Sequence, residues 1–219
     1  MREAGAAWYD EPLTVCWGKD MKKTDLENTM DKELRIQTNG RDDSKEDDYH
    51  HPYEPTPYSV LERLAESEYI TKDNILVDYG CGKGRVDFYL SAKVGCKAVG
   101  IDFDQRMIKK SLENNRSFIG RRKPEFLHIS AENYEITEGD CFYFFNPFPI
   151  EILRSVLGKI TDSYYNNPRP MRLFFYYPDE EYVAYLMTKN ELMFVDEIIC
   201  MDLFEGENER ERILIFEVI

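Results

Sequence analysis

The chain has 219 residues, of which 42% are hydrophobic, and a formal charge of −14. This length accommodates one domain with an extension, and the composition supports a full core. No run of about 18 apolar residues occurs, so no membrane span is predicted. The acidic charge is spread over the chain, with −6 in residues 1–57 (14 acids, 8 bases) and −8 in the remainder. Such a balance disfavours long duplex nucleic acid as a partner, because phosphate backbones bind clustered Lys and Arg.

Residues 1–54 are predicted to form an acidic extension that is partly disordered or caps a ligand cleft. They are polar and weakly periodic, and 39–48 is a charge run with an Asn-Gly turn signal. The first eight residues lack a long apolar segment, so no signal peptide is predicted. Five cysteines without a C-x-x-C pair indicate reduced thiols of a cytoplasmic protein without a zinc cluster. The adjacent His50 and His51 predict no metal site, because no third ligand accompanies them.

A proline-rich segment follows and leads into a short amphipathic helix at 59–65. Three prolines between residues 52 and 57 force an extended entry. The next apolar run, 75–78, ends in Asp78 and is followed by glycines at 80, 82 and 84. This order predicts a buried strand, a glycine-rich turn and a helix over 84–94, which is the opening unit of a nucleotide-binding α/β domain.

The spacing of the glycines indicates the kind of ligand. A dinucleotide site usually has G-x-G-x-x-G with a pyrophosphate at the helix N-terminus. Here the spacing is G-x-G-x-G, and Asp78 stands two residues before the first glycine. A carboxylate at this place repels a phosphate and suits a cationic ligand. Arg85, directly after the turn, is expected to face solvent or form a local ion pair.

Strands and helices alternate from residue 75 onward, and the tail is a β-hairpin. Alternation predicts a parallel, doubly wound sheet with helices on both faces, and the hairpin makes the last strand antiparallel. The predicted strands lie at 75–78, 98–102, 125–129, 141–145, 172–177, 192–203 and 210–219. The predicted helices between them lie at 84–94, 105–118, 150–160 and 180–188.

Ligands of open α/β sheets bind beyond the carboxyl ends of the strands. The second strand ends at Asp102, 24 residues after Asp78. A carboxylate there can accept both hydroxyls of a ribose, as it does in dinucleotide folds. Phe103 beside it is a candidate to lie against the base, and Asp104 is a candidate N-cap.

These features resemble the class I S-adenosylmethionine-dependent methyltransferases over residues 55–219. Asp78-Tyr-Gly-Cys-Gly-Lys-Gly84 is similar to their motif I, and five α/β units with a final hairpin are similar to their seven-stranded sheet. The resemblance implies that the cofactor is S-adenosylmethionine. It also implies that the cofactor contacts the acid at the end of the first strand, the glycine turn, and the acid at the end of the second strand with the residue after it. The residues concerned are Asp78, Gly80, Cys81, Gly82, Gly84, Asp102 and Phe103.

After the third strand the sequence departs from that family. Many members have Gly-Asp-Ala, with the Asp accepting from the adenine amino group, whereas this chain has Ser130 in the place of that Asp. Ser130, the backbone of Ala131 or Glu132 is therefore expected to make this contact. The Tyr/Pro/Thr segment before motif I lies beside the cofactor in many members, so Tyr53 and Thr56 are candidates for substrate contacts or only fix the turn.

After the fourth strand, Asn146-Pro-Phe-Pro149 resembles motif IV, (N/D)-P-P-(Y/F), of methyltransferases that act on amino groups. There the Asn side chain and the Pro carbonyl accept from a planar amino group, and the aromatic ring stacks on it. The resemblance implies that Asn146, Pro147 and Phe148 lie at the methyl-transfer site. The alternative is a turn that only ends the strand. Tyr177, at the end of the fifth strand, is a further candidate to border the substrate.

The sequence thus predicts a cytoplasmic methyltransferase that uses S-adenosylmethionine, with the acceptor and the oligomeric state left open. Two other classes stay possible. A dinucleotide-dependent oxidoreductase requires the G-x-G-x-x-G turn that is missing here. A cofactor-binding scaffold without activity could use the acidic extension to bind a partner protein.

Overall fold

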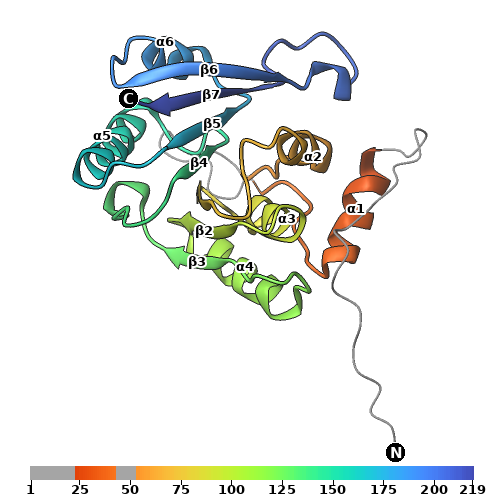
Figure 1. Cartoon of the computed structure of the whole chain (residues 1–219). Coiled ribbons are helices and arrows are strands. Elements are labelled where there is room, and N and C mark those ends of the chain that lie inside the picture. The colour runs from red at the N-terminus through yellow and green to blue at the C-terminus, as the bar shows by residue number, and fades with distance from the viewer. Residues whose placement is uncertain (1–22, 43–52) are drawn as a thin grey trace, which may run out of the picture.

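The computed structural model describes residues 23–42 and 53–219, which form a seven-stranded sheet between two layers of helices (Figure 1). The strands are β1 (Ile75–Tyr79), β2 (Lys97–Asp102), β3 (Glu125–His128), β4 (Cys141–Phe144), β5 (Arg172–Tyr176), β6 (Leu192–Ile199) and β7 (Arg212–Val218). The α-helices are α1 (Lys23–Leu34), α2 (Tyr58–Glu66), α3 (Arg85–Lys93), α4 (Gln105–Ser117), α5 (Ile150–Asn166) and α6 (Glu180–Leu186). Two single-turn 3₁₀ helices lie at Ala131–Asn133 and Met201–Leu203.

The strand order is β3-β2-β1-β4-β5-β7-β6. Neighbouring strands from β3 to β5 are parallel, and β7 runs antiparallel to both β5 and β6. This arrangement confirms the predicted sheet and its terminal hairpin. The order reverses between β1 and β4, so the connections that leave these two strands diverge. A crevice opens at such a switch point, at the carboxyl ends of the strands.

The core has two parts, one on each face of the sheet. The first part packs α1, α2, α3 and α4 on one face, and the second packs α5 and α6 on the other (Figure 1). Strand β4 shows why both parts form, because side chains alternate between the faces of a strand. Cys141 and Tyr143 belong to the first part, whereas Phe142 and Phe144 belong to the second.

Helix boundaries differ from the predictions at two places. Helix α1 was not predicted, because it is highly charged and buries few apolar side chains, chiefly Met30 and Leu34. Its packing onto the domain stabilises it, rather than its own periodicity. Helix α5 extends six residues past the predicted end at Ile160, to Asn166. Ile160 is its last buried residue, so the apolar pattern stops before the helix does.

None of the helices in 23–42 and 53–219 is long and apolar enough to cross a membrane. The four cysteines in these ranges are free and buried. His50, His51 and most of the charge run at 39–48 lie outside the described residues.

Candidate functional site

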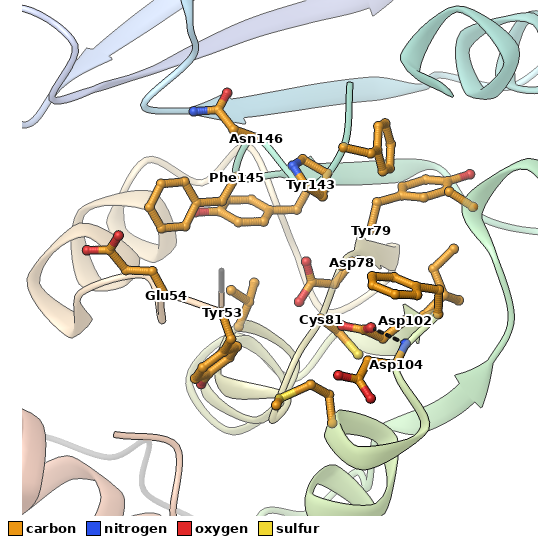
Figure 2. Close-up of a pocket in the computed structure, with 18 of the residues that line it drawn as sticks. Tyr53, Glu54, Asp78, Tyr79, Cys81, Asp102, Asp104, Tyr143, Phe145 and Asn146 are labelled. Carbon is orange, nitrogen blue, oxygen red and sulfur yellow. Dashed lines mark hydrogen bonds between the residues drawn. The ribbon is translucent and has the colours of Figure 1, made fainter. Parts of the chain in front are cut away.

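A cavity of about 300 Å³ opens at the carboxyl ends of β1, β2 and β4, in the crevice that the strand order creates (Figure 2). The turn after β1, the end of β2, the segment after β3 and the turn after β4 form its walls. Residues 53–56 close it from the N-terminal side. Figure 2 shows Glu54, Tyr143 and Phe145 toward one end, and Asp102 and Asp104 toward the other.

The glycine turn takes its shape from backbone bonds and close contacts. The N–H groups of Gly80 and Cys81 both donate to the carbonyl of Ile101, at 2.9 and 3.0 Å. Gly80 has φ +77°, and a Cβ added there would lie 2.7 Å from Cβ of Pro147. Only glycine combines this conformation with so close a neighbour. The turn after β1 therefore lies directly against the turn after β4.

Two further glycines belong to the turn but do not line the cavity. Gly82 has φ +55°, and a Cβ added there would lie 2.2 Å from the ring of Tyr53. Gly84 has φ +86° and faces the rings of Phe126 and Phe88. Gly80 and Cys81 line the cavity, whereas Gly82 and Gly84 shape the turn.

Asp102 ends β2 and links the glycine turn to the start of α4. One carboxyl oxygen accepts from the N–H of Gly82 at 2.9 Å, and the other accepts from the N–H of Asp104 at 2.7 Å. Burial raises the pKa of Asp102 to about 6, although these backbone bonds oppose the shift. A carboxylate has about four acceptor positions, so two remain for a ligand diol. Phe103, next along the chain, is 40% exposed and also lines the cavity.

Asp78 presents a second carboxyl group to the cavity (Figure 2). It is 3% exposed, and burial raises its pKa to about 7. The neighbouring Asp87 opposes this shift, and the charge of Asp102 adds to it. No basic side chain is among the groups that shift it. A cationic ligand group would therefore find an uncompensated carboxyl at this place.

The segment after β3 lines the cavity with Ser130, Ala131 and Glu132. Ser130 Oγ accepts from Nδ2 of Asn133 at 2.7 Å, and Glu132 is exposed. All three predicted candidates thus lie at the cavity. Which of them contacts an adenine amino group stays a prediction.

The turn after β4 also lies at the cavity, but its side chains are already engaged. Asn146 adopts φ +40°; its Nδ2 donates to the carbonyl of Tyr177 at 2.6 Å, and its Oδ1 accepts from the N–H of Asp179 at 3.3 Å. The amide thus ties β4 to the loop after β5. Phe148 is 7% exposed and packs edge-to-face on Tyr79. Its place in the core leaves little of the ring for stacking on a substrate.

Of the three substrate candidates, two line the cavity. Tyr53 covers the glycine turn, and its hydroxyl donates to the carbonyl of Thr38 at 2.7 Å. Thr56 Oγ1 and the hydroxyl of Tyr143 lie 3.0 Å apart. Tyr177 does not line the cavity, and the guanidinium of Arg210 lies over its ring, 4.3 Å from the centroid.

Arg85 is the largest departure from the sequence analysis. It is 2% exposed and binds the N-terminal segment instead of facing solvent. Its guanidinium pairs with Glu27 and donates to Thr38 Oγ1 at 2.7 Å, Asn39 Oδ1 at 2.5 Å and the carbonyl of Thr56 at 3.2 Å. An arginine directly after a glycine turn gives no sequence signal for a contact with residues about 50 positions earlier.

Several cavity residues were not singled out from the sequence. Among them are Glu54, which is exposed, and the rings of Tyr143 and Phe145, which lie on β4 and directly after it. The alternation of β4 could have found the two rings, because it puts them on the same face as Cys141.

The cavity lining is strongly acidic. Its carboxyl groups belong to Asp42, Glu54, Asp78, Asp102, Asp104 and Glu132, and its basic groups to Arg85 and Arg106. Both arginines are paired, Arg85 with Glu27 and Arg106 with Asp104 at 2.6 Å. The site consequently favours a cation over a phosphate.

Comparisons with known proteins agree with this geometry. Residues 76–160 match the family model described as a methyltransferase domain. The chain is similar to a protein-lysine N-methyltransferase of Saccharolobus islandicus (strain REY15A), with 36% identity over 66 residues. That alignment covers 30% of this chain and 41% of the relative, so the chain spans less than half of the curated relative that it matches.

Solved structures of other proteins share the fold, and two of them serve as examples. The magnesium protoporphyrin IX methyltransferase of Synechocystis PCC 6803, with bound S-adenosylmethionine, has a TM-score of 0.54 at 15% identity, over 74% of this chain and 77% of that one. A putative rRNA methylase of Clostridium thermocellum has a TM-score of 0.55 at 12% identity, over 76% and 99%.

Residues 76–160 are therefore part of a methyltransferase domain that is built on a Rossmann-like sheet. The fold is that of the class I S-adenosylmethionine-dependent methyltransferases, which the Synechocystis enzyme shares. The family prediction made from motif I and the terminal hairpin is confirmed.

Proposed function

We propose that the protein transfers the methyl group of S-adenosylmethionine to the amino nitrogen of a cationic acceptor, a lysine side chain of a protein. The single observation that carries this proposal is the acidic, aromatic cavity at the switch point of the sheet. Six carboxyl groups and two paired arginines suit a sulfonium cofactor and a basic acceptor, and they disfavour a phosphate-bearing one.

The cofactor half of the site would lie between the glycine turn and Asp102. The ribose hydroxyls would bind the two acceptor positions that Asp102 has left. The methionine part would follow Gly80 and Cys81, with its ammonium toward Asp78. Ser130, Ala131 and Glu132 would border the adenine, with Phe103 beside it.

The acceptor half would lie at the end of the cavity that holds Glu54, Tyr143 and Phe145 (Figure 2). An aromatic ring and a carboxylate together attract an ammonium group. The printed name of the Saccharolobus relative, a protein-lysine N-methyltransferase, supports the same acceptor. A planar amino group, as predicted from the Asn146 turn, would require the Asn146 amide to leave Tyr177 and Asp179.

The reaction is an in-line displacement. The lone pair of a neutral amine forms the N–CH₃ bond while the S–CH₃ bond breaks, and the sulfur keeps that electron pair. The lysine ammonium gives up a proton to solvent or to a carboxylate of the cavity before the attack, and the methylated product is again cationic. The protein contributes chiefly by holding nitrogen and methyl carbon about 3 Å apart.

The test is methyl transfer from radiolabelled cofactor to a lysine-rich peptide, with the matched peptide that carries arginine at every lysine as control. Label on the lysine peptide alone is the expected result. The Glu54→Gln variant should raise KM for that peptide several-fold and leave the affinity for cofactor unchanged. Label on an adenine- or cytosine-containing oligonucleotide instead would support the planar amino group. Cofactor binding without transfer to any acceptor in fractionated cell extract would support the scaffold.

A further inference from the structure

Two buried hydroxyl groups, those of Thr56 and Tyr143, meet at the wall of the cavity. Thr56 Oγ1 and Tyr143 Oη lie 3.0 Å apart, and the two residues are 3% and 1% exposed. Both residues line the cavity. Burial raises the pKa of Tyr143 well above its usual range, so its hydroxyl stays protonated. The pair is thus a neutral hydrogen-bonding group in a lining whose ionisable groups are mostly acids.

The hydroxyl pair lies where the two halves of the cavity meet. Tyr143 on β4 is in register with Asp78 on β1, the acid toward which the ammonium of the cofactor is expected to point. Phe145 belongs to the acceptor end of the cavity, and Figure 2 shows its ring next to that of Tyr143. An acceptor nitrogen that enters past Glu54 and Phe145 toward the cofactor therefore reaches the hydroxyl of Tyr143.

The surrounding backbone holds both hydroxyls in place. Prolines at 55 and 57 restrict the backbone on both sides of Thr56. The carbonyl of Thr56 accepts from the buried guanidinium of Arg85 at 3.2 Å. Tyr143 comes from β4, which is paired with a strand on each side. The two hydroxyls are therefore positioned before a substrate arrives, and such preorganisation favours selection between similar acceptors.

The hydrogen-bonding capacity of the pair suits an acceptor nitrogen that still carries hydrogen. Each hydroxyl has one proton and two lone pairs. Their mutual bond uses one proton and one lone pair, and no other hydrogen bond of either hydroxyl is found within residues 23–42 and 53–219. At least one lone pair of Tyr143 can thus accept an N–H. A neutral lysine nitrogen has two N–H groups, a monomethylated one has one, and a dimethylated one has none.

We propose that the Tyr143 hydroxyl, fixed by Thr56, accepts an N–H of the acceptor nitrogen and so selects primary and secondary amines over tertiary ones. Dimethyllysine is then the main final product. In each transfer the ammonium first loses a proton to solvent or to a carboxylate of the cavity. The nitrogen lone pair then forms the N–CH₃ bond, and the electron pair of the S–CH₃ bond stays on the sulfur.

A tertiary amine fits this place poorly for two reasons. It leaves the lone pair of the buried Tyr143 hydroxyl without a donor, and it brings a methyl group against the oxygen. This inference rests on the proposed function, because it takes the lysine acceptor from it.

The experiment supplies the full chain with S-adenosylmethionine and three versions of one lysine-rich peptide, in which every lysine is unmethylated, monomethylated or dimethylated. Mass spectrometry counts the methyl groups added to each version over time. Tyr143→Phe removes the hydroxyl and keeps the ring, and Thr56→Val removes the hydroxyl that fixes it. Tyr134→Phe is the matched control, because Tyr134 is partly buried and does not line the cavity. Calorimetric titration with S-adenosylhomocysteine shows which variants are folded.

The wild type and Tyr134→Phe should methylate the dimethylated peptide about 5- to 100-fold more slowly than the monomethylated one, the cost of leaving a buried acceptor without a donor. In Tyr143→Phe this difference should disappear, because no acceptor is left unpaired and the ring leaves room for a methyl group. Thr56→Val should narrow the difference, because the hydroxyl of Tyr143 is then no longer held.

Equal rates on the monomethylated and dimethylated peptides in the wild type would overturn this inference and leave the lysine acceptor standing. An unchanged difference in Tyr143→Phe would do the same. Absence of transfer to any of the three peptides would overturn the proposed function as well. If Tyr143→Phe does not bind S-adenosylhomocysteine, the comparison of Thr56→Val with the wild type decides.

Discussion

At the scale of single residues, Asp102 links the glycine turn to the start of α4 and is expected to hold the ribose. Asp102→Asn replaces one acceptor oxygen by an amide and removes the charge. Cofactor affinity should fall by about 10- to 100-fold, the worth of one or two hydrogen bonds to a charged group. Calorimetric titration with S-adenosylhomocysteine measures it. Asp73→Asn, an exposed acid before β1 whose side chain is 83% exposed, should bind like the wild type. Equal losses of affinity in both variants would show that Asp102 does not bind the ribose.

The raised pKa of the buried Asp87 carboxyl leads to a prediction about stability. A carboxyl whose pKa is raised in the folded state contributes stability at low pH that is lost as the pH rises above its unfolded value near 4. For each proton that the folded state retains, the free energy of unfolding falls by about 1.4 kcal/mol per pH unit above that value. Asp87→Asn retains no proton at this position. The free energy of unfolding of Asp87→Asn, relative to that of the wild type, should therefore rise steadily between pH 5 and pH 7.

Urea unfolding at three pH values measures this difference, and Asp73→Asn again serves as the control. A constant difference between Asp87→Asn and the wild type over pH 5 to 7 would show that Asp87 is ionised in the folded protein.

Residue roles were predictable only where a backbone position fixes them. Gly80 and Asp102 could be placed at the cavity from the sequence because strand ends and glycine turns fix their positions. Asn146 and Phe148 could be placed at the same edge, but the partners of their side chains could not. Asn146 binds the loop after β5, and Phe148 enters the core on Tyr79. Such contacts depend on the conformation of a distant loop, which a local motif does not encode.

At the scale of elements, α1 and residues 36–42 are fastened to the glycine turn. Asp31 accepts from the backbone of Thr38 and Asn39 and from the hydroxyl of Tyr58. Lys83 donates to the carbonyls of Asn39 and Gly40, at 2.7 and 3.2 Å. This part of the predicted extension thus packs beside the cofactor side of the site. The domain boundary at residue 54 stays a prediction.

Arg85 is the residue by which this connection can be tested. Arg85→Met leaves Glu27 without its buried cation, and breaking such a pair costs about 3–5 kcal/mol. The free energy of unfolding in urea should fall by this amount. The control is Lys97→Met, which breaks a pair with Glu138 whose side chains are 58% and 71% exposed, and it should cost about 0–1 kcal/mol. A cost for Arg85→Met that equals the control would contradict the role of Arg85.

Elements of the sheet were predictable to within a few residues, because each strand is a short apolar run between turn signals. Helix α1 was not, because its sequence is mostly charged and its few apolar side chains gain their burial from α2 and the core. Peripheral elements such as α1 are therefore harder to predict from the sequence than the strands of the sheet. Propensity is a weak guide wherever packing by a distant element decides.

At the scale of the whole molecule, the sheet order brings four separate chain segments to one cavity, and most of its ionisable groups are acids. The alternation of strands and helices was sufficient to predict a parallel, doubly wound sheet with a terminal hairpin, but the spatial order of the strands was not predicted. The acidity of the cavity was not predictable from the net charge of −14, because net charge does not say where the carboxyl groups meet.

The most direct test of the account is a crystal structure of the full chain with S-adenosylhomocysteine. We expect both ribose hydroxyls within hydrogen-bonding distance of the Asp102 carboxylate, and the ammonium toward Asp78. A nucleoside bound away from the glycine turn, or an Asp102 side chain directed away from the sugar, would contradict it.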